Sequence, residues 1–136
     1  MHLKNQDDYK QVRAEYVFSS ARRKGFDYAQ SKWLIAQVFQ ENGAMTADRR
    51  GDAGCSVGLT QWNECARGKD PSGGDWKKQI DIFLEEVWTK YQKNDNFYAA
   101  SVSWNSPRAF HGVYKTKYYY HVLNKYNNYI LHEEEK

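Results

Sequence analysis

Two carboxylates near the middle of the sequence, Glu41 and Asp52, could together perform acid–base chemistry. Glu41 ends a mostly apolar segment that we expect to be a helix, where the helix dipole and the loss of solvent both disfavour a charged carboxylate. We therefore predict a raised pKa for Glu41. A carboxyl group that stays protonated near neutral pH can donate a proton to a leaving oxygen, as in glycosidic bond cleavage.

Asp52 lies eleven residues after Glu41, within the sequence RGDAG. An Asp beside glycines usually bonds its own backbone in a turn, and a Glu at a helix end is often simply solvated. The functional interpretation is that Asp52 faces Glu41 across a cleft, where it positions a water molecule or balances a cationic transition state. The pattern of residues alone leaves these interpretations open.

Two cysteines, Cys55 and Cys65, stand ten residues apart in the same region. The sequence has no C-x2-C pair and no matching pair of histidines, so a zinc site has almost no support. A disulfide in an oxidising compartment and two buried free thiols are both compatible with this spacing. We expect neither a metal nor an organic cofactor.

Apolar spacing predicts the helices that must position these residues. Residues 75–93 carry an amphipathic stripe with Asp75 as the N-cap. Residues 27–43 are apolar on most sides, which suits a helix buried in the middle of the domain and ended by Gly43. Three further helices are predicted at residues 7–25, 96–104 and 116–135.

The helical period disappears between Gly43 and Gly74, where a glycine-rich sequence leaves room for a small hairpin. The chain has 136 residues, two prolines and no linker-like stretch, so we expect one domain spanning residues 1–136. The predicted fold class is α+β and mainly α, with a central buried helix and a small β-hairpin or turn region around residues 44–62.

The charge of the chain is mildly basic, with 20 Lys and Arg against 17 Asp and Glu. This balance permits an anionic partner such as a cell wall, a membrane surface or a nucleic acid, but it does not choose among them. The sequence contains neither a run of roughly 20 apolar residues for a membrane span nor an apolar signal-peptide core near Met1. We expect a monomer without integral membrane association.

The run QENGAMTADRRGDAGCSVGLTQWN, residues 40–63, resembles the central motif of the lysozyme-like superfamily. The resemblance is to its lytic transglycosylase and goose-type lysozyme branch and to phage tail lysozymes. In that family a Glu ends the central helix and a GDxGxxxGLxQ-like turn follows, so Glu41 matches the catalytic acid. The positions that match the turn are Gly51, Asp52, Gly54, Ser56, Gly58, Leu59 and Gln61.

Two later segments resemble the family more loosely. AASVSWNSP is similar to the family's AxxxYNxGP-type segment, with Trp104 and Asn105 in place of Tyr-Asn. YYYHV is similar to its final Tyr-x-x-x-Val segment through Tyr118 and Val122. The resemblance implies that such positions help to hold the catalytic Glu and line the sugar groove.

The resemblance implies a muramidase that cleaves the β-1,4 bond between N-acetylmuramic acid and N-acetylglucosamine in peptidoglycan. Glu41 would be its general acid and base, and Asp52 its electrostatic or water-positioning partner. Hydrolysis and lytic transglycosylation both stay open, because Asn42 stands where transglycosylases often have Ser and Asn63 where goose-type enzymes can have Asp. The residues expected to line the groove near the cleaved bond are Ser56, Gln61, Trp62 and Asn63.

Two other classes of function are alternatives. One is an inactive peptidoglycan-binding or phage structural module, which the retained Glu41 disfavours. The other is a basic nucleic-acid-binding domain, which the scattered basic residues and the lack of a recognition motif disfavour. The expected partner is the glycan strand of peptidoglycan at the bacterial cell wall, in the periplasm or outside the cell. Without a signal peptide of its own, the chain would be phage-encoded or a domain of a larger exported protein.

Overall fold

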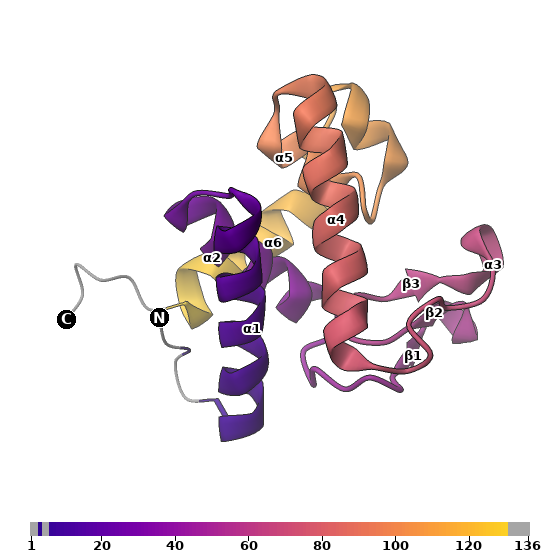
Figure 1. Ribbon diagram of the computed structural model, residues 1–136. Helices are drawn as coiled ribbons and strands as arrows, with labels where there is room; N and C mark the ends of the chain where they lie inside the picture. The colour runs from indigo at the N-terminus through magenta and orange to yellow at the C-terminus, as the bar shows by residue number, and fades with distance from the viewer. Residues whose placement is uncertain (1–2, 4–5, 131–136) are drawn as a thin grey trace.

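The computed structural model describes Leu3 and residues 6–130, which form a mainly helical α+β fold with a small antiparallel sheet, as the sequence predicts. Figure 1 shows the long helix α4 between a group of helices formed by α1, α2 and α6 and the three short strands. The elements in chain order are α1 (Asp8–Lys24), α2 (Tyr28–Glu41), β1 (Arg50–Gly51), the 3-10 helix η1 (Asp52–Gly54), β2 (Ser56–Val57), β3 (Trp62–Asn63), α3 (Glu64–Arg67), α4 (Trp76–Asn94), α5 (Phe97–Val102), the 3-10 helix η2 (Pro107–His111) and α6 (Lys117–Tyr129).

Helix α2 is the buried centre of the fold, because every residue from 31 to 39 is buried and both α1 and α6 pack against it. Two polar side chains on this helix bond to α5. Trp33 Nε1 donates to the Ser101 hydroxyl at 3.1 Å, and the Gln37 amide donates to the Ser101 carbonyl at 2.6 Å. These contacts fix the helix that ends in Glu41.

Asn42, and not the predicted Gly43, ends α2. Its backbone turns to an extended conformation with φ −152° and ψ 91°, and its side-chain oxygen accepts from two backbone N–H groups of the following loop. Its amide nitrogen donates to the carbonyls of Thr46 at 2.8 Å and Gly58 at 3.1 Å. A buried side chain thus satisfies the backbone after Glu41 and links the helix end to the strand region.

The three strands pair in the order β1–β2–β3, within residues 50–63, close to the predicted hairpin region. Val57 lies opposite Arg50 on one side and Trp62 on the other. Strands of two residues give a sheet little stability of its own. Its attachment to the helices comes from Leu59, which is fully buried in the core, and from Gln79 on α4.

The side chain of Gln79 fixes the turn between β2 and β3. Its Oε1 accepts from the Leu59 N–H at 2.9 Å, and its amide nitrogen donates to the Ala47 carbonyl at 3.1 Å. Gly58 passes beside this side chain with φ +90°, and a Cβ at Gly58 would lie 2.5 Å from the Gln79 amide. The turn therefore needs glycine both for its backbone conformation and for the close approach.

Two helices are shorter in the structure than the sequence predicts. In residues 96–104 only Phe97–Val102 is helical, so Trp104 follows the helix. The helix predicted for residues 116–135 ends at Tyr129, because Ile130 becomes extended and forms an antiparallel bridge with Leu3. Residues 131–135 of that prediction lie outside the described residues.

We predict that Gly58→Ala lowers the free energy of unfolding more than the matched control Gly112→Ala. Both glycines have positive φ, +90° and +98°, but a Cβ added at Gly112 would meet no described atom within 4 Å. Left-handed backbone strain should cost about 1–2 kcal/mol at either position. Displacing Gln79 should add about 1–3 kcal/mol at Gly58. Urea unfolding of both variants measures the difference, and equal losses would contradict the close approach.

Candidate active site

A pocket of about 570 Å³ brings together the end of α2, the small sheet, α3, α4 and the segment after α5. All of the predicted site residues except Trp62 and Tyr118 line it. Those that do are Glu41, Asp52, Ser56, Gln61, Asn63, Trp104 and Asn105.

Burial raises the pKa of Glu41 to about 8, so the predicted raised pKa is confirmed. Loss of solvent around the half-buried carboxyl is the largest cause. A hydrogen bond from Tyr118 acts in the opposite direction, and the negative charge of Asp52 raises the pKa further. At neutral pH Glu41 is therefore mainly protonated and able to donate a proton.

Tyr118, in the first turn of α6, orients the carboxyl of Glu41. Its hydroxyl donates to Glu41 Oε2 at 2.6 Å. Burial and the nearby Glu41 carboxylate raise the pKa of Tyr118 well above its ordinary value, which keeps the phenol protonated as a donor. Val122, one turn later on α6, is fully buried and packs in the core with α2. Tyr118 thus acts behind Glu41 and does not line the pocket itself.

Asp52 lies on the exposed turn that follows β1. Its carboxylate accepts from the Ser56 hydroxyl at 2.6 Å. Asp52 and Ala53 both have left-handed backbone conformations, with φ +50° and +56°, which are uncommon for residues other than glycine and are often found at functional sites. Asp52 is close enough to Glu41 for its charge to raise the Glu41 pKa. The two carboxyl groups therefore share one pocket and interact electrostatically.

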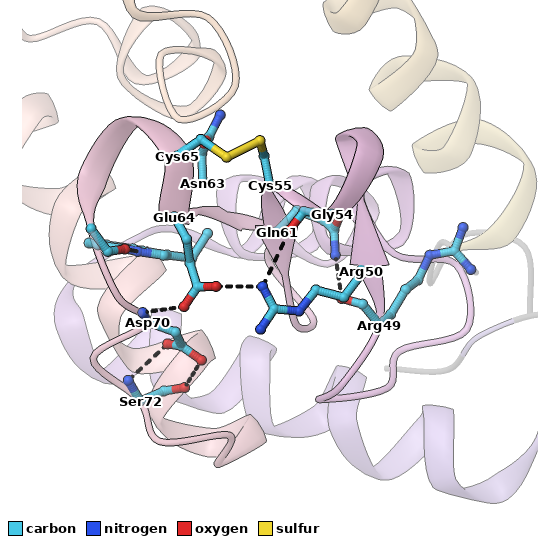
Figure 2. Close-up of polar contacts among 12 residues, drawn as sticks. Arg49, Arg50, Gly54, Cys55, Gln61, Asn63, Glu64, Cys65, Asp70 and Ser72 are labelled. Carbon is cyan, nitrogen blue, oxygen red and sulfur yellow. Dashed lines mark hydrogen bonds and ion pairs between the residues drawn. A yellow bond between two sulfur atoms is a disulfide. The ribbon is translucent and has the colours of Figure 1, made fainter.

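The amide side chains of Gln61 and Asn63 line the pocket and also hold its backbone. The Gln61 amide donates to the carbonyls of Arg49 at 3.2 Å and Gly58 at 2.9 Å, and Figure 2 shows the first of these bonds. Asn63 caps α3 by accepting from the Ala66 N–H at 3.0 Å. Both amides are thus positioned by the fold, while their contact with a substrate remains a prediction.

The two tryptophans of the predicted site have different places. Trp104 is half-buried at the pocket wall, and its Nε1 donates to the Thr60 carbonyl at 2.6 Å. Trp62 lies outside the pocket lining, and its Nε1 donates to the Gly68 carbonyl at 2.9 Å. The guanidinium of Arg67 lies over the Trp62 ring, 4.0 Å from its centroid. Trp62 therefore supports Arg67, which lines the pocket, whereas Trp104 lines the pocket itself.

Cys55 and Cys65 form a disulfide, with their Cα atoms 5.2 Å apart, which decides between the two alternatives that their spacing left open. Figure 2 shows this bond near the ion pair between Arg50 and Glu64. Glu64 also accepts from the Asp70 N–H at 2.7 Å. These links join β1, α3 and the loop after α3, so the backbone of this pocket wall has little freedom.

Three charged residues line the pocket that the sequence analysis did not assign to it, namely Arg67, Glu86 and Lys90. Arg67 ends α3, while Glu86 and Lys90 lie one turn apart on α4. In the sequence these residues are typical of a charged, solvent-exposed helix surface. On α4, the apolar stripe occupies the buried face, so Glu86 and Lys90 are expected on the exposed face. For Glu86 and Lys90 the only local signal was their i, i+4 spacing. The lining is completed by Ala66, Ser103 and Pro107.

Leu3 and residues 6–130 contain neither a candidate metal site nor a candidate membrane-spanning helix. Within this part of the chain, no group of three or more His, Cys, Asp or Glu side chains is arranged to hold a metal ion. Nor does any helix in the same range have the length and apolarity to cross a bilayer.

We predict that Tyr118→Phe raises the pKa of Glu41 above about 8, because the lost hydrogen bond stabilises the ionised carboxylate. Titration of the Glu41 carboxyl by 13C NMR measures the change. Tyr120→Phe, an exposed change on the same helix, is the control and should leave the pKa where it is. A lower pKa in Tyr118→Phe would show that the phenol does not stabilise the carboxylate.

Comparison with protein-family models, with curated proteins and with solved structures finds no match for this chain. The function therefore has to be inferred from the pocket. The features that carry this inference are the protonated Glu41, its bond from Tyr118 and the neighbouring carboxylate of Asp52.

Proposed function

We propose that this protein is a lysozyme-like muramidase that cleaves the β-1,4 bond between N-acetylmuramic acid and N-acetylglucosamine in peptidoglycan. The observation that carries the proposal is Glu41, a half-buried carboxyl with a pKa of about 8 at the wall of a pocket that also holds Asp52. Two carboxyl groups in one cleft, one of them protonated at neutral pH, are what glycosidic cleavage requires. A buried helix that ends in Glu41 is followed along the chain by a small sheet, and this order of elements supports membership of the lysozyme-like superfamily.

In the proposed reaction, Glu41 donates its proton to the glycosidic oxygen as the bond from that oxygen to C1 of the muramic acid ring breaks. Positive charge then develops at C1, and the nearby carboxylate of Asp52 offsets it. The hydrogen bond from Tyr118 stabilises the ionised Glu41 that remains. Glu41 next acts as a base and takes a proton from the nucleophile that attacks C1.

Two nucleophiles fit this second step. If Asp52 positions a water molecule, the product is a hydrolysed muramic acid with a reducing end. If no water is held, a hydroxyl of the muramic acid itself attacks C1 and closes an anhydro ring. The bond from Ser56 to Asp52, 2.6 Å long, holds the Asp52 carboxylate in a set orientation and so supports the first outcome.

The proposed place of action is the bacterial cell wall, in the periplasm or outside the cell. The disulfide between Cys55 and Cys65 supports an oxidising compartment. Arg67 and Lys90 in the pocket suit an anionic polymer such as peptidoglycan.

We predict that Glu41→Gln lowers the release of soluble fragments from purified peptidoglycan by at least about 100-fold, because general acid catalysis is lost. Mass spectrometry of the released fragments measures the effect. Glu85→Gln is the matched control, since Glu85 is an exposed carboxylate on α4 that pairs with Lys24. It should leave the rate unchanged.

The wild-type rate should also fall as the pH rises through about 8, because Glu41 then loses the proton that it must donate. An active Glu41→Gln variant would refute the assignment. A wild-type protein that binds peptidoglycan without cleaving it would favour an inactive binding module. Binding of nucleic acid, with neither binding nor cleavage of peptidoglycan, would favour the nucleic-acid-binding alternative.

Asp52→Asn should lower the share of reducing-end products relative to anhydro products, because a neutral amide is a weaker hydrogen-bond acceptor than a carboxylate for the water that it positions. The same fragment analysis gives the ratio of the two product types. Asp48→Asn, an exposed change before β1, is the control. An unchanged ratio in Asp52→Asn would exclude a water-positioning role for this carboxylate.

A further inference from the structure

Arg67, Glu86 and Lys90 form a charged cluster at the pocket wall, and the proposed reaction gives none of them a role. Glu86 pairs with both cations. Its Oε1 contacts the Arg67 guanidinium, and its Oε2 accepts from Lys90 Nζ at 3.3 Å. One carboxylate thus serves two cations, so the cluster carries one excess positive charge.

Two tryptophan rings also hold Arg67 in place. Its guanidinium carbon lies 4.0 Å from the centroid of the Trp62 ring and 5.0 Å from that of Trp104, both within the range of cation–π attraction. Its short helix α3 is tied to the turn before β2 by the disulfide of Cys65. A positive group fixed before binding loses little entropy when a ligand arrives.

The two cations of the cluster remain accessible. The side chains of Arg67 and Lys90 are 35% and 28% exposed, against 20% for Glu86. In the described part of the chain, Glu86 is the only carboxylate with which either cation forms an ion pair. Glu41 and Asp52 reach the pocket from the end of α2 and from η1, whereas the cluster reaches it from α3 and α4. We call the part of the pocket lined by Arg67 and Lys90 its cationic region.

We propose that Arg67 and Lys90 bind a carboxylate of the glycan substrate. The inference rests on the proposed function and narrows its substrate to strands that carry acidic groups near the cleaved bond. The peptide attached to the lactyl group of N-acetylmuramic acid supplies such carboxylates, and so does the lactyl group itself where the peptide has been removed. A strand of N-acetylglucosamine alone has none. The bound carboxylate accepts charge-assisted hydrogen bonds from both cations and offsets the excess charge.

The test compares dissociation constants for three probes, measured with Glu41→Gln protein so that the probes stay intact. The probes are glycan strands with peptides, strands stripped of peptides, and oligomers of N-acetylglucosamine. Adding Lys90→Gln should weaken binding of an acidic strand about 10-fold, the factor expected for one charge-assisted hydrogen bond, and leave the neutral oligomer unaffected. Lys93→Gln, an exposed change on the same helix, is the matched control and should change none of the three.

A second variant should act in the opposite direction. Glu86→Gln removes the internal carboxylate and leaves two positive charges without their shared partner. It should therefore tighten binding of acidic strands and again leave the neutral oligomer unaffected. An improvement in affinity cannot come from damage to the fold, so this variant tests the charge directly.

The outcomes separate the inference from the function on which it rests. A Lys90→Gln effect on peptide-bearing strands alone supports the peptide as the source of the carboxylate, and an effect on stripped strands supports the lactyl group. Equal loss of affinity for acidic and neutral probes, or no loss for either, would overturn the carboxylate site and leave the muramidase proposal standing. Binding of none of the probes, together with no cleavage by the wild type, would overturn both.

Discussion

The burial of α2 is the constraint on which the site depends, because the helix delivers its last side chain to the pocket from the interior of the fold. Residues 31–39 are buried without a break, so Glu41 emerges where solvent is already scarce. The packing that stabilises the helix therefore also destabilises a charge at its end, and the pKa rises. The hydroxyl of Tyr118 limits this effect and sets the direction of the carboxyl.

The opposite wall of the pocket is held in a different way, since the sheet is too small to form a core. Leu59 is its fully buried apolar anchor in the core, and Val57 on β2 is buried as well. The other attachments are polar: Asn42 bonds to the Gly58 carbonyl from the end of α2, and Gln79 bonds to the Leu59 N–H from α4. The disulfide adds a covalent link within the wall. Both neighbouring helices therefore position the turn between β2 and β3, and β2 pairs with β1, the strand that precedes Asp52.

Local signals in the sequence predicted the helices, because a helix depends mainly on residues that are close together along the chain. The apolar stripe and the cap at Asp75 located α4, and the buried character of residues 27–43 located α2. The sequence could not predict the features that depend on contacts between segments far apart in the chain. The role of Asn42 needs the Gly58 carbonyl brought beside it. The cationic region forms because Arg67 on α3 pairs with Glu86 on α4, and the spacing of residues along either helix does not predict that contact.

The anchoring by Gln79 has a consequence for how the pocket can change during evolution. The side chain of Gln79 bonds to both Ala47 and Leu59. The segment between these two residues is therefore an excursion away from α4 whose two ends are fixed to that helix. Asp48, near the start of this excursion and before β1, is exposed, whereas Arg49 and Arg50 after it are bonded to Gln61 and Glu64. Substitutions or added residues at Asp48 would reshape the rim before β1 without moving α2. The fold thus separates a carboxyl that must stay in place from a rim that is free to diverge.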